Sequence, residues 1–305
     1  MPTPRYLGGQ AVVEGVMMRG ERHWAAAVRT PDGGIEVVVH DAPHWTDRWA
    51  HVPIVRGVVS LAESLALGFR ALTWSADRQL PEEERLSSRA MGWTIGGALA
   101  FFTALFIVVP TFINAGVANV FGVSGVAYDV VEGVIRLAIF LGYLAAISAV
   151  PDIKRVFQYH GAEHKAIAAY ERDAELTPDS AQRFTTEHVR CGTNFLLTVM
   201  VVTIVVYAFV GRPDLFWLVT SRILLLPVVA GLAYEVIRAA AAHMDRPWVR
   251  TLMAPGLGLQ RLTTRQPSLD QLEVAIASLR AALTPEQLAE VDARTSAPRS
   301  AVGAF

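Results

Sequence analysis

Two histidines and a glutamate at helical spacing are the residues of this chain best suited to chemistry. They lie in the segment YHGAEHK (159–165). On a helix, His160 and His164 are one turn apart on the same face, and Glu163 lies beside them. Two imidazoles so placed can hold a divalent metal, and a nearby carboxylate can act as a general base toward water. The order His-x-x-Glu-His is that of inverted zincins, which predicts metal ligands at His160 and His164 and a catalytic role for Glu163.

Further ligand-type residues follow downstream. His188 and Cys191 precede an apolar segment, and an imidazole and a thiolate are both good zinc ligands. Glu235 ends a later apolar segment, and inverted zincins take a third ligand from a later helix. The set predicts a divalent metal cofactor, with zinc favoured. The alternatives are histidines hydrogen-bonded at a helix seam, a buried cysteine at a helix start, and an ion pair of Glu235 with Arg238 or Lys165.

The composition points to a membrane protein. The chain has 305 residues, 52% of them hydrophobic, a net charge of −1 and a mean hydropathy of +0.35. It is too apolar for an ordinary soluble protein, and the lack of basic excess argues against a nucleic-acid partner. The single cysteine excludes an intrachain disulfide. No basic segment followed by an apolar run begins the sequence, so a cleaved signal peptide is not expected.

Four apolar stretches are each long enough to cross ~30 Å of hydrocarbon, which takes about 20 residues. They cover residues 93–117, 130–150, 193–211 and 215–233. Lysines and arginines concentrate before the first, between the second and third, and after the fourth, which places both termini in the cytoplasm. Arg136 and Arg222, near the outer ends of their spans, are expected to snorkel to the interface.

The predicted fold is therefore mainly α, a polytopic helix bundle in the lipid bilayer of the inner (cytoplasmic) membrane. Its four spans lie within residues 93–242, and the segment 152–192, with its His, Glu and Cys residues, faces the cytosol. Residues 5–50 predict a small β-rich cytosolic unit, because strand-like runs flank the turn Pro31-Asp32-Gly33-Gly34. Residues 51–75 predict an amphipathic helix, interfacial or re-entrant, because its charges disfavour a simple span.

The C-terminal part is predicted to be cytosolic. Residues 254–283 are expected to begin with a loop, signalled by Pro255 and its glycine neighbours. An amphipathic helix with Ser268 as its N-cap should follow. Residues 293–305 predict a tail.

Six motifs run through most of the chain, from about residue 6 to residue 281. They are GGQAVVEGVMMRG (8–20), RGVVSLAESLALGFRAL (56–72), YHGAEHKAIAAYE (159–171), RCGTNF (190–195), LLLPVVAGLAYEVIR (224–238) and APGLGLQRLTTRQPS (254–268). In these the chain resembles the bacterial YqhQ-like family, a domain of unknown function whose members are predicted to be integral membrane proteins and metal-dependent enzymes. Val189 stands where the family usually has proline. Beyond the metal-ligand candidates, the resemblance implies roles for Glu14, Arg19, Arg56, Glu63, Glu171, Arg190 and Tyr234.

Two functions of different classes compete. The first is a membrane-embedded hydrolase, in which the two helical histidines bind the metal and Glu163 activates water on a substrate such as a peptide. The second is a non-catalytic membrane scaffold or assembly factor, with a closed structural site of four His and Cys ligands. A thiol enzyme based on Cys191 and a small-molecule transporter are weaker alternatives.

Overall fold

The N-terminal part of the chain forms an antiparallel sheet. The computed structural model describes residues 7–81, 83, 87–210 and 214–296. Its four strands pair in the order β1-β2-β3-β4, which confirms the predicted N-terminal β structure. They are β1 (Gly8–Val12), β2 (Gly15–Arg19), β3 (His23–Arg29) and β4 (Ile35–Asp41).

Helices make up most of the remainder, as predicted. In chain order they are α1 (Trp45–Trp49), α2 (Val55–Gln79), α3 (Ser88–Thr103), the π-helical turn η2 (Ala104–Val108), α4 (Val109–Phe121), α5 (Val126–Ile147), α6 (Pro151–Glu171), α7 (Pro178–Ala181), α8 (Gly192–Ala208), α9 (Leu215–Leu224), α10 (Leu226–Ala242), α11 (Pro247–Thr263), α12 (Leu269–Ala282) and α13 (Pro285–Ser296).

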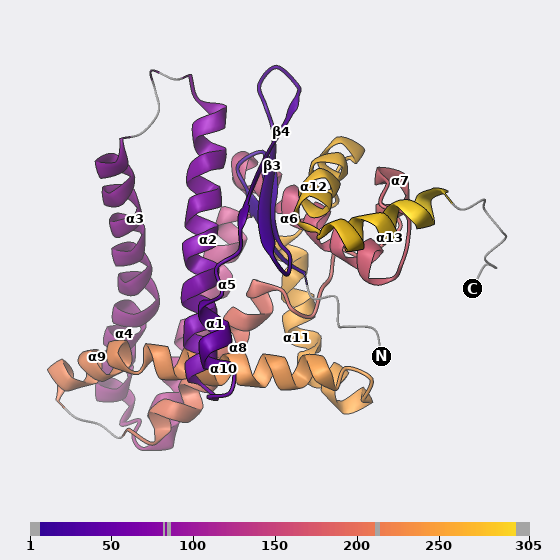
Figure 1. The fold of residues 1–305 in the computed structure, drawn as a ribbon. Coiled ribbons are helices and arrows are strands. Elements are labelled where there is room, and N and C mark those ends of the chain that lie inside the picture. Colours follow the sequence, from indigo (N-terminus) through magenta and orange to yellow (C-terminus); the bar gives the residue numbers. More distant parts are fainter. Residues whose placement is uncertain (1–6, 82, 84–86, 211–213, 297–305) are drawn as a thin grey trace.

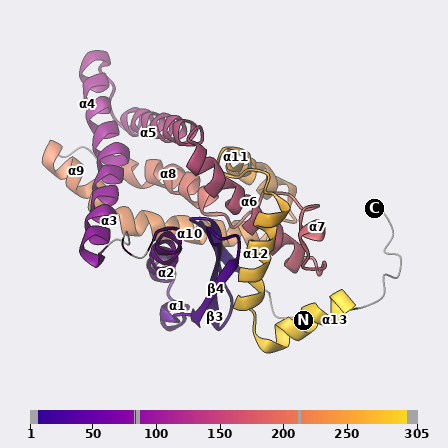
Figure 2. The same cartoon turned by 90° about the horizontal axis from the view of Figure 1, so that it is seen from above.

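The sheet is covered on both faces. Successive side chains of a strand point to opposite faces, and in β3 Ala25 and Ala27 join a core built with α6 and α12. Trp24, Ala26 and Val28 join a second core with Leu67 and Ala71 of α2. Figures 1 and 2 show α2 on one side of the sheet and α6 and α12 on the other. The small side chains of β3 let helices approach both faces, so β2 and β3 form an internal layer, while β4 has no buried residue.

Two helices are long and apolar enough to cross a membrane. They are Arg89–Phe121, with 33 residues, and Val126–Ile147, with 22. The pair Phe216–Leu224 and Leu226–Ala242 counts as a third if it is one span, but it bends by 43°. The apolar α8 has only 17 residues. Two or three of the four predicted spans are thus supported by length and composition, which suggests a membrane protein.

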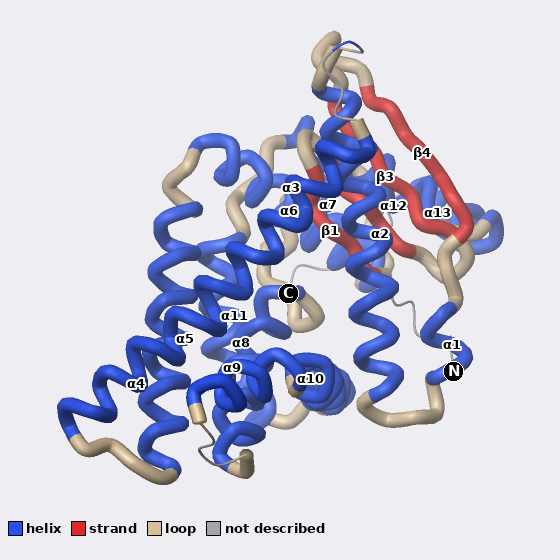
Figure 3. The backbone as a smooth tube through the Cα atoms, turned by 90° about the vertical axis from the view of Figure 1, so that its left-hand side faces the viewer, coloured by secondary structure: helices blue, strands red, loops and turns tan. Residues whose placement is uncertain are grey.

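The bend between α9 and α10 changes the predicted architecture. Pro227 lies in the first turn of α10, where a proline is tolerated; within one continuous helix with α9 it would remove a hydrogen bond and clash with the preceding turn. In Figure 1, α9 and α10 run across the direction of α3 instead of alongside it. Figure 3 shows the sheet at one end of the molecule and α4, α5 and α9 at the other.

Arg136 and Arg222 do not snorkel; both are buried where α5, α8 and α9 meet. The Arg222 guanidinium lies 3.3 Å from Asp129 and 3.1 Å from Glu132, and Arg136 also pairs with Glu132. The Arg222 guanidinium is 4.0 Å from the centroid of the Tyr207 ring. Two carboxylates thus balance the charge of the two cations inside the helix cluster, while Nε and Nη1 of Arg222 are buried without a hydrogen-bond partner among the described residues.

The C-terminal part departs from its prediction in one place. The loop expected after residue 254 is not found, and Pro255 and Gly256 lie inside α11. A Cβ on Gly256 would be 1.8 Å from Oδ1 of Asn194 in α8, so this glycine serves close packing and not a turn. The cap at Ser268 is confirmed. Residues 293–296 of the predicted tail belong to α13, and the remainder lies outside the described residues.

Candidate metal centre

Helix α6 holds the two histidines at the boundary of the sheet core. Its Tyr159, Ala162 and Ala166 are buried against the sheet, which fixes the rotation of the helix. His160 and His164 then lie on a neighbouring face, with ring centroids 4.5 Å apart. The predicted one-turn spacing thus brings the two imidazoles together.

Cys191 joins the two histidines from a distant part of the sequence. It is the N-cap residue of α8, and its Sγ lies 3.3 Å from Nε2 of His160. One donor atom from each of His160, His164 and Cys191 lies within 4.8 Å of the others. The connection from α6 therefore folds back, as expected, to bring the cysteine to the histidine pair.

Backbone carbonyls orient both rings. Nδ1 of His160 lies 2.8 Å from the Thr263 carbonyl, and Nδ1 of His164 bonds the Thr186 carbonyl. A carbonyl can only accept, so each Nδ1 must donate, and in the neutral ring the lone pair is left on Nε2. This outer contact is typical of metal-ligating histidines.

The donor set fits a divalent metal such as zinc. Nε2 of His164 is buried and has no hydrogen-bond partner among the described residues. Burial also lowers the pKa of His164, which favours the neutral ring that a metal requires. Two imidazoles and a thiolate are zinc-type ligands, and three protein ligands leave one position of a tetrahedral site open.

Glu163 lies between the histidine face and the sheet. Its side chain is 5% exposed, and a Cβ on Gly9 of β1 would be 2.8 Å from the carboxylate. Its Oε2 is buried without a hydrogen-bond partner in the described part of the chain. Burial raises the pKa of Glu163 to about 7, and the charge of His160 opposes this shift.

His188 lies beside the three donors but faces another partner. Its ring centroid is 5.6 Å from that of His164, while its Nε2 is 3.4 Å from a carboxylate oxygen of Glu171. Arg190 pairs with the same carboxylate. The structure therefore brings together three of the four His and Cys residues predicted as ligands and leaves His188 in a group with Glu171 and Arg190.

Glu235 is placed at the junction of α2 and α10, outside the three-donor cluster. Its carboxylate accepts a hydrogen bond of 2.7 Å from Nε of Arg56 and a second from the other end of that guanidinium. Beside it, Tyr234 packs against Gly57, where a Cβ would approach within 2.8 Å. The ion pair foreseen as the alternative for Glu235 exists, with Arg56 in place of Arg238 or Lys165.

Two motif carboxylates tie the sheet to its covering helices. Glu14, at the β1–β2 turn, binds Arg155 of α6 and accepts from the Tyr159 hydroxyl at 3.3 Å. Glu63 of α2 is fully buried; it pairs with Arg19 and accepts from both N and Oγ1 of Thr46. Glu14 thus holds α6 against the sheet, and Glu63 holds α2 and α1 to it on the other side.

Gln260 is a residue of the site that the sequence did not single out. It is fully buried in α11, and its side-chain amide bonds both the N–H and the carbonyl of His188, each at 2.8 Å. Lys165 similarly donates to the carbonyls of Gln182 and Phe184. Both hold backbone groups, so ligand spacing carries no signal for them.

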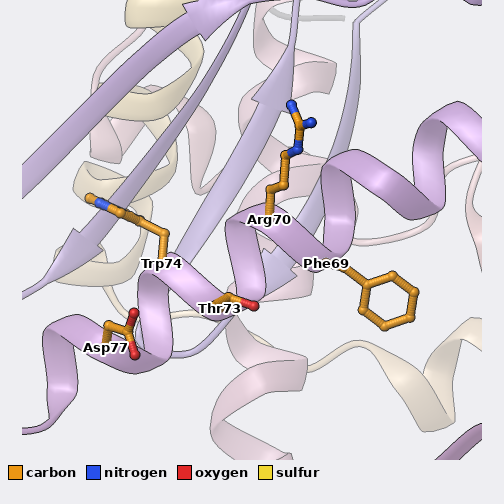
Figure 4. A pocket seen from close by; sticks show the side chains of 5 residues that line it. All are labelled: Phe69, Arg70, Thr73, Trp74 and Asp77. Atoms are coloured by element: carbon orange, nitrogen blue, oxygen red, sulfur yellow. The ribbon is translucent and has the colours of Figure 1, made fainter. Parts of the chain in front are cut away.

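Two concavities of the surface lie away from the histidine cluster. One, of about 400 Å³, is lined by Phe69, Arg70, Thr73, Trp74 and Asp77 of α2 (Figure 4). A second, of about 430 Å³, adds residues of β3 and β4. Both are on the α2 side of the sheet, whereas α6 covers the opposite face. The histidine cluster is therefore not part of either.

Comparison with known proteins places the chain in a family. The uncharacterized protein YqhQ of Bacillus subtilis (strain 168) is 36% identical over 310 residues, which cover 96% of this chain and 97% of that protein. No solved structure matches. Residues 52–285 match the family model described as a protein of unknown function, DUF1385. The chain is thus a member of the DUF1385 family, to which the YqhQ-like resemblance also pointed.

Proposed function

We propose that this protein is a membrane-embedded hydrolase that uses a divalent metal, with zinc favoured. His160, His164 and Cys191 would hold the metal. The observation that carries the proposal is the buried Nε2 of His164, which lacks a hydrogen-bond partner in the described structure beside the His160–Cys191 pair. Such a polar atom costs free energy when left unmatched, and a metal would satisfy it.

The protein's own groups have distinct roles in this proposal. A bound metal supplies Lewis acidity toward water and a substrate carbonyl. The carbonyls of Thr263 and Thr186 keep the two rings oriented. Glu163 takes a proton from the attacking water at its carboxylate and returns it to the leaving group, as a general base and then a general acid. Peptides are the proposed substrates, by analogy of motif.

Metal analysis of the purified protein tests the proposal. The wild type should hold about one metal per chain, and His160→Ala, His164→Ala and Cys191→Ser should each lose it. His188→Ala and Glu235→Gln should keep it. Glu163→Gln should retain the metal but lose hydrolysis of a quenched fluorescent casein. A wild type without stoichiometric metal, or ligand variants with unchanged metal content, would sink the proposal.

Two further candidates share the cluster. The distance of 3.3 Å between Cys191 Sγ and His160 Nε2 also suits a thiol enzyme, whose activity alkylation would abolish and chelation would spare. The cluster also links α6 to the start of α8, as the structural metal of a non-catalytic scaffold or assembly factor would. If the protein is such a scaffold, Glu163→Gln would leave its function nearly unchanged.

The proposed topology keeps four spans, with both termini and the metal centre on the cytoplasmic side of the inner membrane. The 17 residues of α8 rise about 25 Å, which is short for a span but can be accommodated by local thinning. Single cysteines on a Cys191→Ser background test this topology with a membrane-impermeant maleimide. The cysteine of Gly122→Cys, between α4 and α5, should react with the maleimide from outside intact cells. The cysteine of Arg183→Cys should not.

A further inference from the structure

One edge of the sheet is open next to the candidate metal centre. Among the strands of the described residues, β1 pairs only with β2, so one row of its backbone groups faces away from the sheet. The hydrogen bond from the Arg29 N–H to the Glu14 carbonyl, at 2.8 Å, fixes which row this is. Because ladder partners alternate, the even-numbered residues of β2 bond β3 and the odd-numbered ones bond β1.

The register then identifies the outward groups. The odd-numbered residues of β2 lie opposite Gly8, Gln10 and Val12, so the backbone groups of these three residues bond to β2. The N–H and C=O groups of Gly9, Ala11 and Val13 therefore point outward. Val13 follows this rule, because its N–H donates to Oγ of Ser75 at 3.2 Å. No hydrogen bond joins the outward groups of Gly9 or Ala11 to another element in the described part of the chain.

The open edge lies on the side of α6 that carries the ligands. Gly8, Gly9 and Gln10 are exposed, while the Glu163 side chain occupies the space that a Cβ of Gly9 would need. Each residue of α6 is turned by about 100° around the helix axis from the one before it. Seen down this axis, Glu163 lies between the residues that face the sheet and the face that carries His160 and His164. A chain lying along β1 would therefore run beside Glu163, toward the histidine face.

We propose that the free edge of β1 binds an extended polypeptide by strand addition, with main-chain hydrogen bonds to Gly9 and Ala11. The substrate class of the proposed hydrolase is then a polypeptide in extended conformation; this rests on the proposed function. Main-chain pairing gives affinity without requiring a particular sequence. Gly9 has no side chain, so the Glu163 carboxylate can lie close to β1, beside which the bound strand would run.

Proline substitution tests the edge directly. In Ala11→Pro the outward N–H is lost but no bond to β2 is broken, because proline is tolerated where the N–H faces outward. Ala11→Val keeps the N–H. Val39→Pro changes an outward N–H on β4, the other edge of the sheet. All three are made in the Glu163→Gln background, so that a bound chain stays intact.

The probe is reduced, carboxymethylated α-lactalbumin, a permanently unfolded polypeptide, added to the full chain in lipid nanodiscs. Ala11→Pro should weaken its binding at least about tenfold, whereas Ala11→Val and Val39→Pro should stay within about twofold. In hydrogen exchange without the proline, the probe should slow the Gly9 and Ala11 amides and leave Gln10 unchanged. The inference is overturned if the probe does not bind, or if Ala11→Pro leaves its binding intact. It is also overturned if the probe binds without slowing exchange at β1.

Metal content and casein hydrolysis, measured without the Glu163→Gln change, separate this inference from the proposed hydrolase. Strand binding should persist after chelation, since Gly9 and Ala11 are not ligands. If the protein holds no metal but protection at β1 appears, the hydrolase fails and the strand site stands. If the wild type holds metal and hydrolyses casein, only the strand site fails when Ala11→Pro changes neither probe binding in the Glu163→Gln background nor the KM for casein in the wild-type background.

Discussion

Gly9 has a steric reason to be glycine. A Cβ there would lie 2.8 Å from Cγ, Cδ and Oε1 of Glu163, whereas a Cβ on Gly8 meets nothing within 4 Å. Glu163 is buried and cannot easily move away. We expect Gly9→Ala to lower the free energy of unfolding by about 1–3 kcal/mol and Gly8→Ala to change it by less than about 0.5 kcal/mol. Thermal unfolding in detergent measures both, and equal effects would contradict the contact.

Gln260 acts on the site through the backbone of His188. Its two hydrogen bonds fix the segment that leads to Cys191. Gln260→Leu should therefore lower metal affinity by about 10–100-fold, the range usual for outer partners of ligands. Competition with a chromophoric chelator measures the affinity. Arg261→Ala, at a side chain that is 78% exposed, is the control and should bind as the wild type does.

At the residue scale, the sequence predicted the groups whose spacing or chemistry is local. His160 and His164 were found because a helix places residues four apart on one face, and Cys191 because a thiolate suits zinc. Whether a distant residue joins them is decided by tertiary packing. Hence Glu235, chosen by analogy, is found with Arg56, and Gln260 was not singled out.

An ion pair contributes to the junction of α2 and α10. Arg56 and Glu235 are joined by two hydrogen bonds, and a planar guanidinium matches a carboxylate best in this form. Arg56→Gln and Glu235→Gln should each lower Tm by a few degrees, and the double variant by less than the sum.

Metal content separates the two roles considered for Glu235. It should be unchanged in all three variants if the carboxylate serves only the junction. Loss of metal in Glu235→Gln alone would instead restore its predicted role as a ligand.

Element prediction succeeded where one local pattern dominated. The strands around the turn at residues 31–34 and the capped helix at Ser268 are present. It was wrong at Pro255 and Gly256, which signal a loop but pack α11 against α8. The span predicted over 215–233 is bent at the start of α10, next to Pro227. A hydropathy average over this segment does not register a single proline and says nothing about the direction of the helix axis.

At the scale of the whole molecule, a neutral set of four charges joins α5 to α9. Arg222 is fully buried between Asp129 and Glu132. Arg222→Met would leave these carboxylates with one fewer cation, and removing one partner of a buried pair costs about 3–5 kcal/mol. Thermal unfolding in detergent should show this loss. Phe209→Ala, at a side chain 88% exposed, should change little, and equal stability of the two variants would refute a role of the charges in assembly.

The π-helical turn η2 has a consequence for the long helix that contains it. Its five residues, Ala104–Val108, include Phe106, whose carbonyl accepts from Nε of Arg136 at 2.9 Å. A turn with i→i+5 hydrogen bonds advances by less than the ~100° per residue of an α-helix, so α3 and α4 do not share the phase that one continuous α-helix would give them. Trp93 on α3 is 78% exposed, while Thr111 on α4 contacts Glu132. The turn thus sets the angular phase between the half of the helix that contacts the buried charges and the half that presents aromatic side chains outward.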